Sequence, residues 1–215
     1  MYKVRVRVAI FQIIGQLIFG WPAYLFRNDT GGRVQADLKS RMDKRQYKDH
    51  FHHKSQVMKS SLGWKIELST AGCVSVLYVL IKYLGKSSLY WYFGPYIVMN
   101  ALLVLYTWLH HTHPDVPHYG EDNYSFLQGA LSTIDRPYPQ IINHLHHNIG
   151  STHVAHHLNY RIPHYRAVAC TEELKCVLGK YYNYDPSSIT SALYNVAKTC
   201  HYVEEVSGVQ KYKKL

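Results

Sequence analysis

Three histidines at helical spacing form the strongest chemical signal in the sequence: His153, His156 and His157. Positions i, i+3 and i+4 lie on one face of a helix, so a helix over this run would present three imidazoles together. Imidazole suits borderline metals such as iron, zinc and copper. Zinc proteases also place histidines at i and i+4, but they need a glutamate after the first histidine. Val154 and Ala155 stand between the histidines here, so the pattern favours a metal site without a protease base.

A second cluster comprises His110, His111 and His113. It follows an apolar stretch directly and is closed by Pro114, which would end a helix. Ionisable residues at the end of a membrane helix are often functional. These three histidines are therefore candidate metal ligands, and solvated interfacial histidines are the alternative for each of them.

A third cluster, His144, His146 and His147, lies a few residues before His153. A turn at Gly150 could bend the chain so that His147 and His153 approach one metal. The first two histidines of this cluster are weaker candidates. The remaining histidines are expected in loops and turns without a metal role: His50, His52, His53, His118, His164 and His201.

The histidine content is the outlying feature of the composition. There are 15 His among 215 residues, and eleven of them lie between His110 and His164. Metal binding is the usual reason for such a concentration. The formal charge of +10 could suit nucleic acid, but no zinc-finger spacing, aromatic RNP pattern or basic heptad helix accompanies it. The four cysteines show no CxxC spacing, so nothing requires an oxidising compartment.

Three apolar blocks, 8–26, 66–84 and 90–109, have the length of membrane helices. Nineteen residues in a helix reach about 28 Å, close to the hydrocarbon thickness of a bilayer. Gln12, Gln16 and Pro22 interrupt the first block, so it could span the bilayer or lie at its interface. The second and third blocks are separated by a short turn and predict a helical hairpin. A pair of buried helices in a soluble bundle is the alternative.

The segments between and after these blocks are polar. Residues 27–65 predict a loop or short surface helices, and the tail from Thr171 is helical in character. Because loops rich in Lys and Arg stay in the cytosol, 27–65 and everything from 110 onward are expected there. The predicted fold is an all-α membrane helical bundle. It has a hairpin of two transmembrane helices, one N-terminal membrane-associated helix, and a cytosolic helical His-rich cap over 110–215.

Six runs of the sequence, in collinear order, resemble the acyl-lipid desaturases of the Δ12 (oleate) type. The resemblance covers nearly the whole chain and is more specific than any single histidine box. The runs are GQLIFGWPAYLF (15–26), HTHPDVPHY (111–119), FLQGALSTIDR (126–136), HNIGSTHVAHH (147–157), IPHYRA (162–167) and GKYYNYDPSS (179–188).

The resemblance implies a membrane-bound oxidoreductase of the endoplasmic reticulum with two non-haem irons. Such an enzyme introduces a cis double bond into acyl chains of membrane lipid, converting oleoyl to linoleoyl, with oxygen as oxidant and cytochrome b5 as electron donor. The HxxHH run matches the third histidine box of the family. No catalytic residue is expected beyond the metal ligands. Asp135 and Asn148, by their proximity in the sequence to the histidines, are candidates to orient the rings. The candidate ligands are His153, His156, His157, His147, His111 and His113.

In the family, two further histidine boxes precede the segment that resembles 15–26. The whole sequence, 1–215, is therefore expected to be one N-terminally truncated desaturase domain. We expect this chain alone to bind iron weakly and to be inactive. An ω3 desaturase or a fatty-acid hydroxylase would share the motifs. A non-catalytic truncated membrane relative and a soluble zinc hydrolase are the alternatives from other classes.

Overall fold

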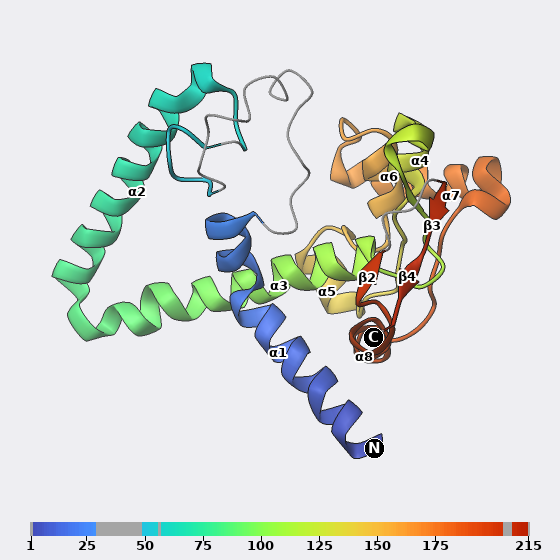
Figure 1. The fold of residues 1–215 in the computed structure, drawn as a ribbon, viewed down its shortest axis with the longest axis horizontal. Coiled ribbons are helices and arrows are strands. Elements are labelled where there is room, and N and C mark those ends of the chain that lie inside the picture. The colour runs from blue at the N-terminus through green and yellow to red at the C-terminus, as the bar shows by residue number, and fades with distance from the viewer. Residues whose placement is uncertain (1, 29–48, 56, 204–207, 215) are drawn as a thin grey trace. The chain divides into compact units, whose positions relative to one another are not determined.

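The computed structural model describes residues 2–28, 49–55, 57–203 and 208–214. The chain divides into two compact units, Met1–Ile14 with Leu105–Leu215, and Gly15–Val104. In the described part, helices predominate and the strands are only two residues long (Figure 1). The predicted all-α class is therefore confirmed.

Three helices are long and apolar enough to cross a membrane. They are α1 (Tyr2–Arg27), α2 (Gly63–Leu84) and α3 (Gly94–His111). The candidate spans, which include neighbouring turns, are Val6–Arg27, Gly63–Ser87 and Leu89–His111. Each span contains one of the predicted apolar blocks and runs a few residues beyond it, so the prediction of three membrane-length helices is confirmed.

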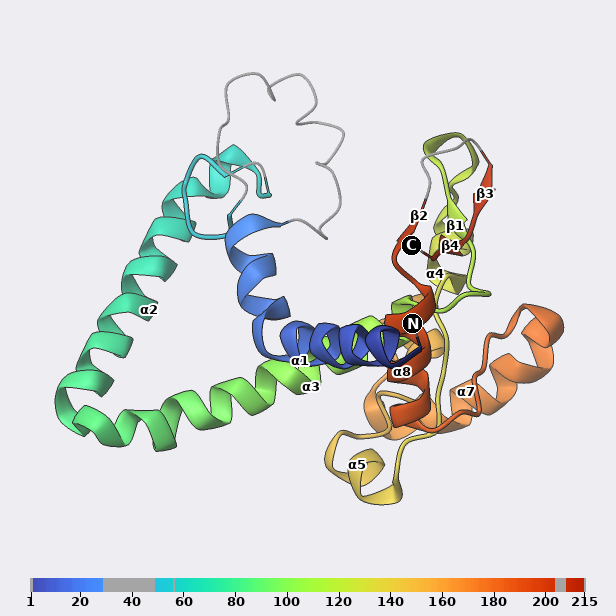
Figure 2. The same ribbon diagram turned by 60° about the horizontal axis from the view of Figure 1, so that its bottom comes forward.

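A short irregular segment joins α2 to α3 where the sequence predicts the turn of a hairpin. Gly85 ends α2 with φ +51°, a positive value that glycine adopts readily because it has no Cβ. A 3₁₀ turn, Gly85–Ser87, and a π-helical turn, Leu89–Phe93, then lead into α3. Both views show α2 and α3 diverging from this segment (Figures 1 and 2).

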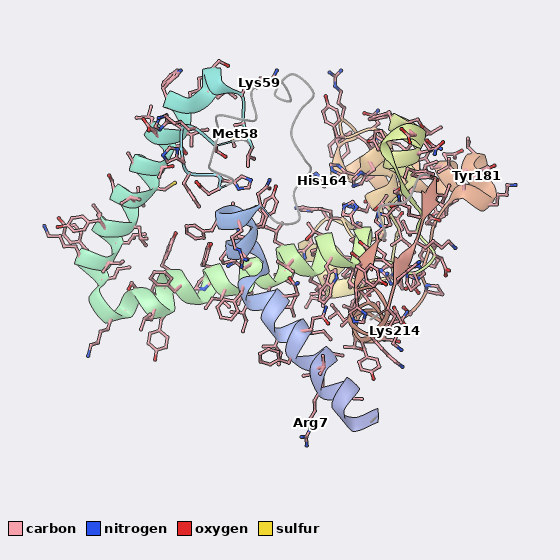
Figure 3. All side chains as sticks on the ribbon, viewed as in Figure 1. Arg7, Met58, Lys59, His164, Tyr181 and Lys214 are labelled. Carbon is pink, nitrogen blue, oxygen red and sulfur yellow. The ribbon has the colours of Figure 1, made fainter. Side chains whose placement is uncertain are left out.

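The apolar side chains of α2 are exposed along the helix. Leu68 is 66% exposed and Val76 is 60% exposed, and side chains project from several sides of the ribbon (Figure 3). A helix that is apolar all round and unburied by protein is expected in lipid rather than water. The exposure of α2, together with the length of the three helices, indicates membrane association.

The segment between α1 and α2 consists of bends and turns over its described residues, 49–55 and 57–59, before a 3₁₀ turn, Ser60–Leu62. His50 Nδ1 lies 3.1 Å from the carbonyl oxygen of Leu25, and His53 Nδ1 lies 2.5 Å from a carboxylate oxygen of Glu67. Both histidines therefore have partners within the unit Gly15–Val104. Six basic residues of this segment lie outside the described residues: Arg33, Lys39, Arg41, Lys44, Arg45 and Lys48.

The unit that contains the His-rich region has its core where α8 (Ile189–Thr199) packs against the last turn of α3. Leu109, Ala192, Val196 and Cys200 are buried together there. Ser188 begins α8 by accepting a hydrogen bond from the backbone of Ser191, an ordinary N-cap. The end of α3, which carries the second histidine cluster, is thereby fixed.

The described part of the cap also contains the helices α4 (Phe126–Leu131), α5 (Gln140–Leu145), α6 (His153–Leu158) and α7 (His164–Leu178). The helix α6 contacts both α4 and α7. With α8, α7 confirms the helical character predicted from Thr171 as far as Thr199. The described residues beyond Thr199 contain strands instead, so the prediction is wrong there.

Two antiparallel strand pairs were not predicted. The strand β1 (His118–Tyr119) pairs with β3 (Val209–Gln210), and β2 (Tyr202–Val203) pairs with β4 (Tyr212–Lys213). Runs of two residues are too short to show the alternation that identifies a strand in a sequence.

Candidate metal centre

The helix α6 places His153 and His157 one turn apart, and His111 at the end of α3 completes a group of three. His153 Nε2 lies 3.2 Å from His111 Nε2 and 3.2 Å from His157 Nε2. The three ligand atoms lie within 4.8 Å of one another. Two helices, forty-two residues apart along the chain, therefore contribute to one cluster of imidazole nitrogens.

The spacing of these nitrogens fits a metal ion. A metal–imidazole bond of about 2.0–2.1 Å and tetrahedral angles place two ligand nitrogens about 3.3 Å apart. The three rings are partly buried, and His153 Nδ1 is buried without a hydrogen-bond partner. This Nδ1 is not one of the converging atoms, and the Nε2 atoms of the three rings are the donors that a bound iron, zinc or copper ion would use.

The surroundings of α6 keep the imidazoles of His153 and His157 neutral. Burial holds the pKa of His153 far below its usual range, and the neighbouring histidines lower it further. Burial, with His111 and His156 nearby, lowers the pKa of His157 to about 4. A neutral imidazole is the form that binds metal, so no proton has to leave these two rings at neutral pH.

His156, the third residue of the HxxHH run, lies beside this group. Its ring centroid is 5.8 Å from that of His153 and 5.7 Å from that of His157. The side chain is exposed and lines two surface pockets. One is formed by Phe126 and residues 156–161, and the other also contains His147 and His164.

His110, from the second cluster, is fully buried and packs against the ring of His153. Its Nδ1 lies 2.5 Å from the carbonyl oxygen of Ile134, and its Nε2 lies 3.2 Å from the hydroxyl of Tyr138. The ring centroid is 4.5 Å from that of His153. Since both ring nitrogens already have partners, His110 supports the ligand rings rather than adding a free donor.

The other predicted ligands lie elsewhere in this unit. His113 Nε2 is 3.8 Å from a carboxylate oxygen of Asp185. The ring of His147 lies against that of His164 (labelled in Figure 3), with centroids 4.4 Å apart. His146 Nδ1 lies 2.8 Å from the hydroxyl of Tyr106. The structure thus brings together His111, His153 and His157 from the predicted set, with His156 adjacent.

A buried polar segment, 133–136, lies next to the centre and was only partly anticipated. Asp135 accepts hydrogen bonds from the backbone of His153 and Val154 and from the Tyr182 hydroxyl. Burial raises the pKa of its carboxyl group, and those hydrogen bonds oppose the rise. Arg136 donates to the carbonyl of Leu109 at 2.9 Å. The sequence flagged Asp135 by proximity, but it gave no signal for Tyr182, which is 47 residues away.

The comparisons with known proteins identify the family of this chain. The profile of the family described as fatty acid desaturase matches residues 9–187. A Δ12 fatty acid desaturase of Mortierella alpina is 38% identical over 211 residues, which cover 96% of this chain and 50% of that protein. A Δ12 acyl-lipid conjugase (11E,13E-forming) of Impatiens balsamina is 37% identical over 204 residues, 93% of this chain and 50% of that protein.

An omega-6 fatty acid desaturase of Brassica juncea, named for the endoplasmic reticulum, is 39% identical over 193 residues. These cover 88% of this chain and 48% of that protein. The chain spans about half the length of the relatives it matches. Because the family profile covers most of the sequence and the relatives align along nearly all of it, this chain belongs to the fatty acid desaturase family.

Proposed function

We propose that this chain is part of an enzyme that introduces a cis double bond into acyl chains of membrane lipid, converting oleoyl to linoleoyl at the Δ12 position. The observation that carries the proposal is the convergence of His111, His153 and His157 at the end of a membrane-length helix. The identity to Δ12 desaturases supports the position of the double bond.

In this proposal His111, His153 and His157 hold iron, and His156, His147 and His113 remain further candidate ligands. Bound iron, with oxygen, supplies the oxidising power to remove hydrogen from an unactivated CH₂ group. The protein keeps the rings of His153 and His157 neutral through burial. The fully buried ring of His110 packs against His153 and excludes water from that side.

The remaining parts of the proposal concern the whole enzyme. Two non-haem irons, cytochrome b5 as the electron donor and a multi-pass location in the endoplasmic reticulum membrane follow from the resemblance. The His-rich cap faces the cytosol in this arrangement, because the basic loop 27–65 favours the cytosolic side.

A zinc hydrolase receives no support from the described residues. Their candidate metal group contains three imidazoles and no carboxylate, whereas zinc hydrolases of the HExxH type use a glutamate as general base. The nearby carboxylate of Asp135 already accepts three hydrogen bonds, and it is fully buried.

The activity can be tested with a chimera in which this chain replaces the matching half of the Mortierella alpina relative. We expect yeast that expresses the chimera to accumulate linoleate, and a His153→Ala chimera to accumulate none. Fatty-acid profiling of total lipids measures the product. A hydroxy acid or an ω3 product in place of linoleate would overturn the Δ12 assignment, provided that the parent relative forms linoleate in the same cells.

The isolated chain tests how much of the centre it holds. Three converging histidines cannot surround two irons, so we expect weak iron binding and no desaturation from this chain alone. Metal analysis of the purified protein measures the iron content. Two tightly bound irons per chain would show that the ligand set within this chain is larger than the cluster described here.

A further inference from the structure

The helix that carries the HxxHH run is too short to fix its own orientation. The helix α6 spans six residues, and helices of this length are marginal without outside contacts. Its first N–H groups need partners from elsewhere. Thr152 stands at the N-cap position, but its hydroxyl donates to the carbonyl of Asn148 at 2.9 Å and makes no cap bond.

Asp135 takes the place of the missing cap from eighteen residues away. One carboxylate oxygen, Oδ1, accepts hydrogen bonds from the backbone of His153 at 2.7 Å and of Val154 at 2.9 Å. The carboxylate is fully buried. A buried acceptor shared by the first two N–H groups fixes both the position and the rotation of α6, and therefore the direction of the His153 ring.

Tyr182 holds the other oxygen of the same carboxylate. Its hydroxyl donates to Asp135 Oδ2 at 2.6 Å. The backbones of the two segments are also joined, since the Asp135 N–H donates to Asn183 O and the Asp185 N–H donates to Asp135 O, each at 3.1 Å. Asp135 is thus held by contacts with the segment 182–185 that do not involve α6.

The neighbours of Asp135 hold the other helix of the cluster. The Ile134 N–H and the Thr133 hydroxyl both donate to the carbonyl of His110, at 3.1 and 2.9 Å. Arg136 donates to the carbonyl of Leu109, and Asp185 pairs with its guanidinium. One buried segment therefore contacts both helices that supply the imidazoles.

We propose that Asp135, held by Tyr182, is a positioning residue that sets the spacing between the His153 and His111 rings and so the affinity of the centre for a divalent metal. The inference rests on the proposed metal-binding function. The hydrogen bonds to α6 come from the carboxylate, and the restraint on the carboxylate comes from the tyrosine, so the two side chains can be tested separately.

The first test replaces Tyr182 with phenylalanine in the full chain in detergent. Tyr181→Phe is the matched control, because Tyr181 is the adjacent tyrosine and is 62% exposed. Co²⁺ alone is the probe, since its ligand-field absorption reports the geometry of bound imidazoles. We expect about tenfold weaker Co²⁺ binding and a shifted spectrum at saturation for Tyr182→Phe, as for other losses around metal ligands, and neither change for the control.

The second test alters the carboxylate itself. Asp135→Asn keeps one oxygen and nearly the same shape, whereas Asp135→Ala leaves two buried N–H groups without an acceptor. We expect both variants to bind Co²⁺ more weakly than the wild type. The alanine variant should lose more affinity, because asparagine still offers one oxygen to the α6 backbone. Should the alanine variant fail to fold, the tyrosine and asparagine variants still decide the matter.

A readout without metal completes the design. Amide exchange of residues 153–158 should be faster in Tyr182→Phe and Asp135→Asn than in the wild type and the Tyr181→Phe control. Wild-type spectra and exchange in both variants would overturn the positioning role, even with a lower unfolding temperature. Co²⁺ binding that persists in His153→Ala would instead contradict the proposed metal site, so the two failures are distinct.

Discussion

At the scale of single residues, His111 and His113 stand two positions apart and meet different partners. His111 is the last residue of α3, and its Nε2 lies 3.2 Å from that of His153. His113 lies beyond the helix end, where its Nδ1 accepts a hydrogen bond from the backbone of Asp115. Burial and Arg136 lower the pKa of His113, and Asp185 opposes this effect.

This difference predicts unequal effects of two matched substitutions. His111→Ala removes one of three converging nitrogens, so we expect Co²⁺ affinity to fall at least about tenfold. His113→Ala removes a ring that faces Asp185, and we expect the affinity to stay within about twofold of the wild type. Titration followed by absorption measures both. Equal losses would show that His113 also contacts the metal.

The residues of the centre were predictable to different degrees. Helical spacing predicted that His153 and His157 share a face, because that relation is local. The direction of His147 was not predictable, since His147 and Asn148 adopt left-handed conformations with φ +53° and +60°. Such conformations are uncommon for residues other than glycine, and no local sequence pattern predicts which residues adopt them. The Tyr182 contact depends on a pairing across 47 residues that no spacing rule describes.

At the scale of the elements, the long helices were predictable and the packing of the short ones was not. Hydropathy alone located α1, α2 and α3, because an apolar run of membrane length leaves few alternatives. The cap helices α4, α5 and α6 have six residues each. Their positions are set by irregular segments between them, including the close approach of Gly150 to the ring of Tyr138.

Two glycine substitutions test this packing. A Cβ on Gly150 would lie 2.1 Å from the ring of Tyr138, which is buried against His110. A Cβ on Gly129 would lie 2.5 Å from the hydroxyl of Tyr124, which is exposed and can move away.

We therefore expect Gly150→Ala to destabilise the cap by about 1–3 kcal/mol and to weaken Co²⁺ binding. Gly129→Ala should change stability by less than about 1 kcal/mol. Urea unfolding in detergent, followed by tyrosine and tryptophan fluorescence, measures the stability. A Gly150→Ala variant as stable as Gly129→Ala would show that the Tyr138 ring can move aside without lowering the free energy of unfolding.

At the scale of the whole molecule, the three membrane-length helices and the polar cap predict where the cysteines stand relative to a bilayer. Cys73 is exposed on α2, inside a candidate span, and Cys176 is exposed on α7 in the cap. Lipid would cover the first thiol, whereas water would reach the second. The proposed topology adds that Cys176 faces the cytosol.

Two single-cysteine variants in sealed vesicles of endoplasmic reticulum test this arrangement with a membrane-impermeant maleimide. We expect the variant that keeps Cys176 to be labelled in intact vesicles, because its side chain would be on the outer, cytosolic face. The variant that keeps Cys73 should react only after denaturation in sodium dodecyl sulfate, because an apolar helix in lipid excludes the charged reagent. Labelling of Cys176 only after permeabilisation would place the cap in the lumen, and labelling of Cys73 in intact vesicles would show that α2 does not cross the membrane.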